Sequence, residues 1–523
     1  MPKPFRTGLT RGSHASRRLP APVLCALLAL VSSLSRADPV TVRIDSGALS
    51  GAARDGVQSF KGIPYAAAPM GDLRWRAPRR PASWSAVRDA TDFGASCPQA
   101  RPPQRVPVGS AAEKTSEDCL MLNVWAPATT SKPAPVMVWI HGGANIQGSG
   151  SGTYTDGSAF ARDGIVLVSF NYRLGPLGFF AHPALMREAG TAAVTDFGLL
   201  DQIAALQWVQ RNITAFGGDP NNVTVFGESA GAEDVLALMT AAPAKGLFQR
   251  AIAESAALWD TWSSLGEAES AATNMASTLD LAGAQATMNQ LRDLPADKLA
   301  QAASLSGGRP IVDGALLRKS PLLALAAGEG LDVPLIIGFN NNEGSLLGSE
   351  SELIESGLPR IDPAPWRTLY GAAADSDATL SRLLFRDAAF AEPARWLATH
   401  RAARSPTYVY RFDYVLSLLR ARRAGADHGS EIPYVFSSWN LNRLTPQDRL
   451  VTAIIHSCWV AFARSGVPAC ESAPQWLPYR PEAEWLMAFA DQPTVQKSSD
   501  DAILDAVRAQ LWSESGTAAA AAQ

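Results

Sequence analysis

Several features are scarce in this 523-residue sequence, and each absence excludes a class of protein. Charge of one sign does not accumulate, because 46 basic and 49 acidic residues give a formal net charge of −3 without a long block of either sign. A nucleic-acid-binding surface would need concentrated positive charge, so nucleic acid is not the expected partner. Apolar runs are short, and none reaches the roughly 20 residues of a membrane-spanning helix. We find no internal repeat and no linker long enough to divide the chain.

The N-terminus has the pattern of an export signal. Basic residues precede the apolar run APVLCALLALVSS, and Ser35-Arg36-Ala37 places small residues where a signal peptidase reads. We expect residues 1–37 to be cleaved off after Ala37, leaving a secreted or periplasmic chain without a stable membrane anchor. The alternative, an N-terminal anchor, would need a longer apolar run. The adjacent arginines at 17 and 18 leave the Sec and twin-arginine routes open.

Cysteine is rare, with five in the chain, of which Cys25 lies in the signal. The remaining cysteines are even in number, as expected in an oxidising compartment. We expect them to pair in sequence order, Cys97 with Cys119 and Cys458 with Cys470. Cys458 lies in the apolar helical stretch VTAIIHSCWVAFA, so for the second pair the alternative is an unbonded core residue.

Short β-branched apolar runs alternate with longer helical patterns along the mature chain. Alternation of this kind predicts an α/β protein with a mostly parallel central sheet and helices on both faces. We expect one domain over residues 38–515, helical insertions at about 260–330 and about 350–405, and an Ala-rich tail at 516–523. The predicted strands are PVMVWI, IVLVSFNY, VTVFGES, RAIAES, VPLIIGF, TYVYRFDY and WLMAFA, and one predicted helix, GLLDQIAALQWVQRNI, has an apolar face at Leu199, Ile203, Leu206 and Val209.

The stretch NNVTVFGESAGAEDVLALM contains a Gly-x-Ser-x-Gly motif between a strand pattern and a helix pattern. A turn this tight leaves the flanking glycines no room for side chains and lifts the serine oxygen above the sheet edge. The N-terminus of the following helix favours negative charge developing there. Ser229 is therefore the predicted nucleophile.

A serine needs a histidine to take its proton and a carboxylate to orient that histidine. In this architecture the order is serine, acid, histidine, and three of the six histidines precede Ser229. His400 and His456 lie in helical patterns, whereas His428 lies in the Gly-bounded loop GADHGSEIPYVF and is the predicted base. The predicted acid is Glu343, which follows a strand in the loop NNNEG; the alternative for it is a solvated surface carboxylate.

The stretch PVMVWIHGGANIQGSG predicts a strand followed by a glycine loop. Such a loop can turn backbone N–H groups toward an oxyanion. An ordinary turn is the alternative, but beside a serine elbow the loop is the expected oxyanion hole.

Together these residues resemble the type-B carboxylesterases, which include the cholinesterases and para-nitrobenzyl esterases, on the α/β-hydrolase fold. The resemblance covers nearly all of the mature chain through FKGIPYA, SEDCLMLNVWAP, NYRLGPLGFF, GLLDQIAALQWVQRNITAFGGDPNNVTVFGESAG, NNNEG and HGSEIPYVF. It implies inserted helical regions around an active-site gorge, the triad Ser229, Glu343 and His428, and a disulfide between Cys97 and Cys119. It also implies oxyanion donors at Gly143, Ala144 and Ala230.

The sequence departs from the family pattern at several positions near the expected site. The family usually has His-Gly-Gly-Gly-Phe in the oxyanion loop, where this chain has Ala144 and Asn145. The loss of the aromatic residue is expected to open or polarise the pocket, which makes Asn145 a candidate pocket residue. After the elbow it usually has small residues, where this chain has Glu233 and Asp234. These carboxylates either interact with the helix dipole or line the pocket. Trp262 aligns with a tryptophan that borders the acyl pocket of cholinesterases, and its alternative is a core position.

The segment between Cys97 and Cys119 bears on substrate charge. In cholinesterases the matching loop carries the tryptophan that holds the choline ammonium, but this segment has no aromatic residue. It carries Arg101 and Arg105 instead, which are either solvated or positioned to bind a carboxylate-bearing ester. Both interpretations predict poor turnover of choline esters.

We therefore expect a serine carboxylesterase that hydrolyses small-molecule esters through an acyl-enzyme, without a metal or an organic cofactor. The alternatives are a lipase, which would show a rate jump above the solubility limit of its substrate, and a non-catalytic binding protein on the same fold. The latter would lack a triad residue, whereas all three are present. The natural ester and the oligomeric state cannot be predicted from the sequence.

Overall fold

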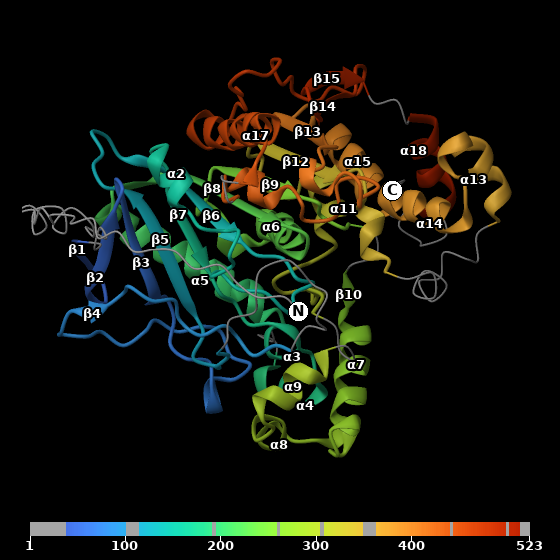
Figure 1. The fold of residues 1–523 in the computed structure, drawn as a ribbon. Coiled ribbons are helices and arrows are strands. Elements are labelled where there is room, and N and C mark those ends of the chain that lie inside the picture. Colours follow the sequence, from blue (N-terminus) through green and yellow to red (C-terminus); the bar gives the residue numbers. More distant parts are fainter. Residues whose placement is uncertain are drawn as a thin grey trace, which may run out of the picture. The chain divides into compact units, whose positions relative to one another are not determined.

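The computed structural model describes residues 38–100, 114–190, 195–258, 262–303, 308–348, 362–439, 443–497 and 501–512. At their centre lies a large sheet whose middle strands are parallel and follow the order β7-β6-β8-β9-β12-β13-β14 (Figure 1). Each of these strands falls on an apolar run that the sequence predicted: β6 (Ala134–Ile140), β7 (Val166–Phe170), β8 (Gly218–Glu228), β9 (Arg250–Glu254), β12 (Leu335–Asn340), β13 (Thr407–Phe412) and β14 (Trp485–Phe489).

Antiparallel strands that the sequence analysis did not predict extend both margins of the sheet. Beyond β7, the sheet continues through β5, β3, β2 and β1, and the pairs β5–β7, β3–β5 and β2–β3 are antiparallel. At the other margin β15 pairs antiparallel with β14. The bounds are β1 (Asp38–Ile44), β2 (Gly47–Arg54), β3 (Val57–Pro64), β4 (Arg88–Asp89), which pairs with β2, β5 (Met121–Pro127) and β15 (Thr494–Lys497).

The two faces of the sheet bury separate apolar clusters because successive side chains of a strand point to opposite faces. On β6, Val136 and Val138 belong to the larger cluster, whereas Met137 and Trp139 belong to the second. Helices α5 (Phe197–Asn212) and α6 (Ala230–Thr240) supply the larger cluster, and α2 (Ser158–Arg162) and α17 (Pro446–Ser465) supply the second. The predicted apolar face of α5 is buried in the larger cluster: Leu199, Ile203, Leu206 and Val209.

The two predicted helical insertions are present. The first contains α7 (Leu265–Thr278), α8 (Met288–Arg292), α9 (Ala296–Gln301) and α11 (Pro321–Ala326), and the second contains α13 (Pro363–Tyr370), α14 (Asp377–Arg386) and α15 (Glu392–Arg401). In Figure 1, α7, α8 and α9 lie together with α4 (Pro183–Ala189) below the sheet. These helices share a smaller apolar cluster, to which Trp75, Phe180 and Phe197 also contribute.

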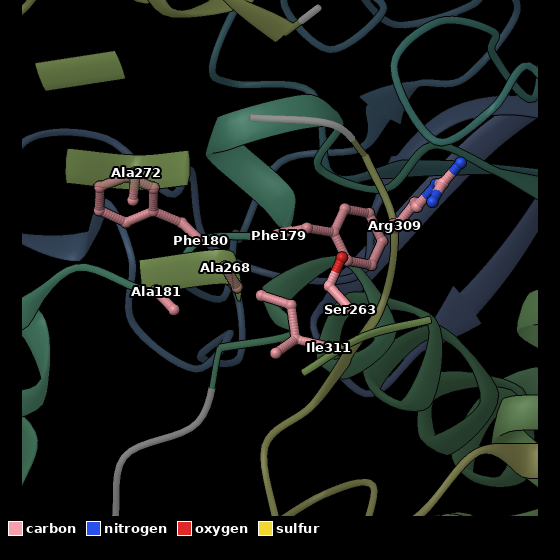
Figure 2. A pocket seen from close by; sticks show the side chains of 8 residues that line it. All are labelled: Phe179, Phe180, Ala181, Ser263, Ala268, Ala272, Arg309 and Ile311. Atoms are coloured by element: carbon pink, nitrogen blue, oxygen red, sulfur yellow. The ribbon is translucent and has the colours of Figure 1, made fainter. Parts of the chain in front are cut away.

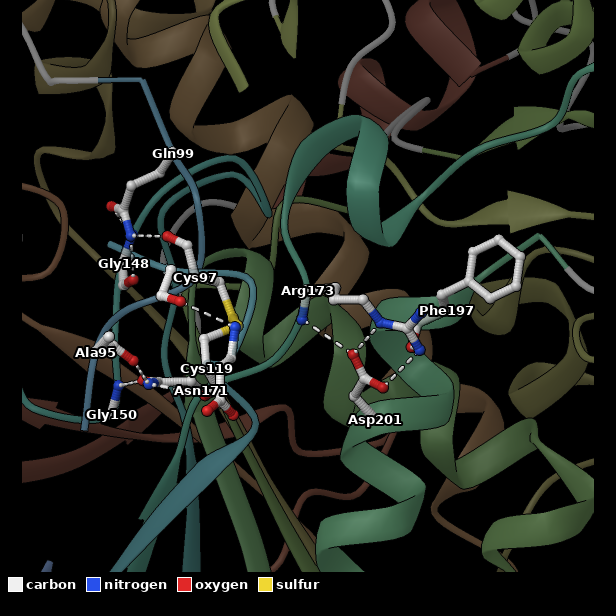
Figure 3. The surroundings of a disulfide bond; sticks show 12 residues. Ala95, Cys97, Gln99, Cys119, Gly148, Gly150, Asn171, Arg173, Phe197 and Asp201 are labelled. Carbon is white, nitrogen blue, oxygen red and sulfur yellow. Dashed lines mark hydrogen bonds and ion pairs between the residues drawn. A yellow bond between two sulfur atoms is a disulfide. The ribbon is translucent and has the colours of Figure 1, made fainter. Parts of the chain in front are cut away.

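Both cysteine pairs are bonded in the order that the sequence predicted, Cys97 to Cys119 and Cys458 to Cys470. Figure 3 shows the surroundings of the first disulfide. Gln99 binds Gly148 twice: its Nε2 donates to the Gly148 carbonyl at 2.9 Å, and its Oε1 accepts from the Gly148 N–H at 3.0 Å. The disulfide segment is thereby attached to the loop that follows β6.

Candidate active site

The predicted elbow is present at the junction of β8 and α6, with Ser229 as the single residue between them. Ser229 has φ 56° and ψ −129°, a strained conformation for a non-glycine residue that functional sites often contain. The motif glycines are needed because a Cβ on Gly227 would lie 2.6 Å from Gly231, and one on Gly231 would lie 2.2 Å from the Ile140 carbonyl oxygen. The Ser229 side chain is only half-buried, so it can be reached from outside.

The structure brings Glu343 and His428 together. Glu343 lies just after β12 and His428 lies in the loop after β13, the neighbouring parallel strand. Oε2 of Glu343 is 2.5 Å from Nδ1 of His428. Oε1 accepts a hydrogen bond from the Asn340 N–H at 2.7 Å, and the carboxylate is fully buried. Glu343 therefore fixes the ring of His428 with Nδ1 protonated and Nε2 turned away, as a general base requires.

Nε2 of His428 faces a carboxylate that the sequence analysis did not single out. Oε1 of Glu228, the residue before the serine, lies 3.2 Å from Nε2. Among the described residues Nε2 has no hydrogen-bond partner, so the bond between Ser229 and His428 is not formed in this arrangement. In free enzymes such bonds are often long and tighten when substrate binds.

Glu228 belongs to a group of buried carboxyls behind the histidine. Asn340 Nδ2 donates to Glu431 at 2.5 Å, and Trp459 Nε1 donates to Glu254 at 2.7 Å. Burial raises the pKa of Glu228 to about 7, that of Glu431 to about 8, and also the pKa of Glu254. The sequence signals were weak: Glu228 lies within the elbow motif and Glu431 three positions after the histidine.

Some of these carboxyls, together with Glu343, act directly on His428. Burial alone would lower the pKa of His428, but the charges of Glu228 and Glu343 outweigh it and raise the pKa. An imidazolium between two carboxylates is consequently favoured in the free protein.

The glycine loop after β6 lies over the serine. A Cβ on Gly142 would be 3.0 Å from Cβ of Ser229. Gly143, Ala144 and Asn145 have φ values of 104°, 54° and 56°, a left-handed run that reverses the chain within a few residues. Ala144 is exposed, whereas Asn145 beneath it is buried. Ala230, the third predicted oxyanion donor, directly follows the serine and opens α6.

Glu233 and Asp234, on the first turns of α6, are both buried. Burial raises the pKa of Asp234 to about 7, against hydrogen bonds from Gln202 and Asn145 that lower it. Burial also raises the pKa of Glu233; the charge of Asp234 raises it further, whereas the charges of Arg309 and His428 lower it. The two carboxyls are thus interior groups, and the charge on His428 reaches Glu233.

The remaining predicted pocket residues are placed as follows. Trp262 is half-buried against the larger apolar cluster. Arg101 and Arg105 lie outside the described residues.

A small pocket, drawn in Figure 2, lies among Phe179, Phe180, Ala181, Ser263, Ala268, Ala272, Arg309 and Ile311. None of the predicted triad residues lines it, and the Arg309 side chain extends away from Phe180 and Ala272 (Figure 2).

Within the part of the chain that the structure describes, no set of three or more His, Cys, Asp or Glu side chains is arranged to hold a metal ion. In the same residues, no helix has both the length and the apolar character needed to cross a bilayer.

Comparison with known proteins gives consistent matches over most of the chain. The sequence profile of the Carboxylesterase family matches residues 38–356 and 370–507. The fumonisin B1 esterase of Sphingopyxis macrogoltabida is 37% identical over 483 residues, which cover 87% of each chain. The para-nitrobenzyl esterase of Bacillus subtilis (strain 168) is 36% identical over 482 residues, covering 87% of this chain and 95% of the esterase. The solved structure of a Geobacillus stearothermophilus carboxylesterase superposes with a TM-score of 0.78 at 33% identity, covering 89% of this chain and 99% of that one.

Proposed function

The chain belongs to the carboxylesterase family and is a carboxylic ester hydrolase; we propose that it acts through an acyl-enzyme on Ser229, after export. The observation that carries the mechanism is the 2.5 Å contact between Glu343 Oε2 and His428 Nδ1, made beside a strained serine elbow. The buried carboxylate of Glu343 holds the proton of His428 at Nδ1, which leaves Nε2 free to accept a proton, as a general base requires.

In the proposed reaction, His428 takes the proton of Ser229 as the serine oxygen attacks the ester carbonyl. The backbone N–H groups of Gly143, Ala144 and Ala230 stabilise the oxyanion. His428 then returns the proton to the leaving alcohol, which departs and leaves the acyl group on the serine. Water then gives a proton to the same histidine as it attacks the acyl-enzyme; the bond between the acyl group and the serine oxygen breaks, His428 returns the proton to Ser229, and the acid leaves.

For the first step Nε2 must be neutral and must turn from Glu228 to the serine. Glu228, 3.2 Å from Nε2, would receive or share the proton that the histidine gives up. A carboxyl whose pKa is raised to about 7 by burial is suited to that exchange near neutral pH.

We also propose that residues 1–37 form a cleaved export signal and that residues 38–515 act as one domain in the periplasm or the medium. The basic residues before an apolar run and the small residues ending at Ala37 support the signal. Two disulfides in the structure are compatible with an oxidising compartment.

Covalent labelling tests the mechanism. A fluorophosphonate should modify Ser229 of the wild-type enzyme, and Ser229→Ala should lose both the label and at least about 10⁴-fold in turnover of a p-nitrophenyl ester. Ser270→Ala, which changes an exposed serine on α7, is the matched control and should keep both. Near-normal hydrolysis by Ser229→Ala would refute the acyl-enzyme.

A further inference from the structure

Two of the residues that depart from the family pattern near the serine, Asn145 and Asp234, are in contact. Nδ2 of Asn145 in the oxyanion loop donates to Oδ1 of Asp234 on α6 at 3.1 Å, across 89 positions of sequence. Their exposed fractions are 1% and 0%. A buried amide facing a buried carboxyl is costly unless both are satisfied, so these two residues depend on each other.

Two further side chains complete the hydrogen bonding of this pair. The Tyr172 hydroxyl, just after β7, lies 2.8 Å from Oδ1 of Asn145 and 2.8 Å from the His141 carbonyl oxygen. Gln202 on α5 donates from Nε2 to Oδ2 of Asp234 at 2.5 Å. The side chain of Asn145 thus ties the loop to α6 and to the segment after β7, and Gln202 connects α5 to the pair through Asp234.

The backbone of Asn145 is fixed as well. Its carbonyl oxygen accepts a hydrogen bond from the Gly175 N–H at 2.6 Å. On another side, a Cβ added to Gly308 would lie 2.6 Å from the same oxygen. Asparagine tolerates the left-handed conformation, φ 56°, better than most residues. The side chain and the main chain of Asn145 therefore hold one conformation of the loop.

We propose that Asn145 and Asp234 are positioning residues that brace the oxyanion loop and hold the adjacent N–H of Ala144 where the oxyanion forms. The inference rests on the proposed function, in which Ala144 is an oxyanion donor. Neither side chain touches the substrate; both act through the backbone of the loop. Oxyanion donors are effective only when preorganised, and removing one costs about 10²–10³ in kcat. The asparagine replaces the family's aromatic residue at this position, and the aspartate is its necessary partner.

A double-mutant cycle tests the brace. Asn145→Gly removes the amide and keeps the backbone conformation accessible, and Asp234→Ala removes the carboxyl. Each should lower kcat for a p-nitrophenyl ester about 10- to 100-fold and change KM less than about threefold, because ground-state binding does not use the oxyanion hole fully. The double variant should be no more than about threefold slower than the slower single variant. Losses that multiply would overturn the proposal.

A swap variant distinguishes positioning from general damage. In Asn145→Asp combined with Asp234→Asn, the amide at 234 can donate to the carboxylate at 145, Tyr172 can still donate to position 145, and Gln202 can still donate to position 234. The swap should recover kcat to within about fivefold of wild type. It should also recover the affinity for a trifluoromethyl ketone, whose tetrahedral adduct places an oxyanion in the hole. A swap variant as slow as the single variants would also overturn the brace. Where the single variants do not fold, a swap variant that fails to recover kcat to within about fivefold of wild type would overturn it in the same way.

Asn212→Ala is the matched control, because Asn212 is a buried amide on the same helix as Gln202 that binds the Asp45 N–H and the Trp208 carbonyl. It should lower the melting temperature and leave kcat unchanged. Fluorophosphonate labelling of each variant separates the two levels of the proposal. If wild-type Ser229 is not labelled, the acyl-enzyme is wrong; if it is labelled and Asn145→Gly keeps wild-type kcat, only the brace is wrong.

Discussion

Replacing Glu228 by glutamine should shift the pH profile of the enzyme to lower pH. In the proposed mechanism His428 must be neutral to accept the serine proton, so kcat/KM is expected to rise with pH through the pKa of His428. The carboxylate of Glu228, 3.2 Å from Nε2, favours the imidazolium and raises this pKa. Glu228→Gln keeps the shape of the side chain and removes its charge.

The size of the shift follows from the distance. Two unit charges 3.2 Å apart attract by about 5 kcal/mol at an effective dielectric constant of about 20, and by about 1 kcal/mol in bulk water. One pKa unit corresponds to about 1.4 kcal/mol, so the range is about one to four units. Burial keeps part of the Glu228 population protonated near neutral pH, which reduces its effect. We therefore expect a shift of about one to two units.

Because the pKa of His428 is raised to about 10, the measurement is kcat/KM for an uncharged p-nitrophenyl ester from about pH 5 to about pH 11, with the spontaneous rate subtracted, at constant ionic strength. Glu254→Gln is the control, because Glu254 is equally buried but contacts Trp459, and its profile should match wild type. An acidic limb that moves by less than about 0.3 units in Glu228→Gln would refute the argument that Glu228 sets the charge of the base.

Three further predictions concern the disulfides, substrate charge and acid stability. Peptide mapping without reduction, on protein from the periplasm or medium, should recover Cys97 linked to Cys119 and Cys458 linked to Cys470, and free thiols would contradict this. Acetylcholine should be a poorer substrate than an uncharged acetate ester, because the segment closed by the first disulfide has no aromatic residue; a measured preference for the choline ester would contradict it. Burial acts to raise the pKa of Asp448, but hydrogen bonds at the start of α17 outweigh it and hold the pKa below its ordinary value. The stability from Asp448 is therefore present above the unfolded-state pKa of about 4 and lost as pH falls further, so Asp448→Ala should cost about 2 kcal/mol at pH 7 and less at pH 3 by denaturant titration.

The sequence predicts those parts of the fold that have a strong local pattern. The strands of the parallel centre are runs such as IVLVSFNY and VPLIIGF, which are buried on both faces and therefore almost wholly apolar. The antiparallel margin has no such pattern: β2 reads GALSGAAR, with little β-branched character. Pairing with β3 stabilises it instead, and pairing between strands is not visible in one segment of sequence.

The candidate site divides in the same way. The elbow at Ser229 is local, and the order of serine, acid and histidine led to Glu343 and His428, which the structure brings together. The contact between Glu228 and His428 depends on how the end of β8 meets the loop after β13. Residue spacing in the sequence does not predict this contact. The sequence singled out Asn145 and Asp234 as separate departures, but their contact follows only from the packing of the oxyanion loop on α6.

The parallel pairing of β12 with β13 has a consequence for how activity arises during synthesis. The acid and the base lie 85 positions apart, and the register joins Leu335 to Thr407, so a long loop must close before they meet. A nascent chain that ends before His428 can contain the complete elbow and oxyanion loop but no base. In the proposed mechanism such a chain is inert, and hydrolysis begins only when roughly the last fifth of the polypeptide, from His428 onward, has folded onto the rest.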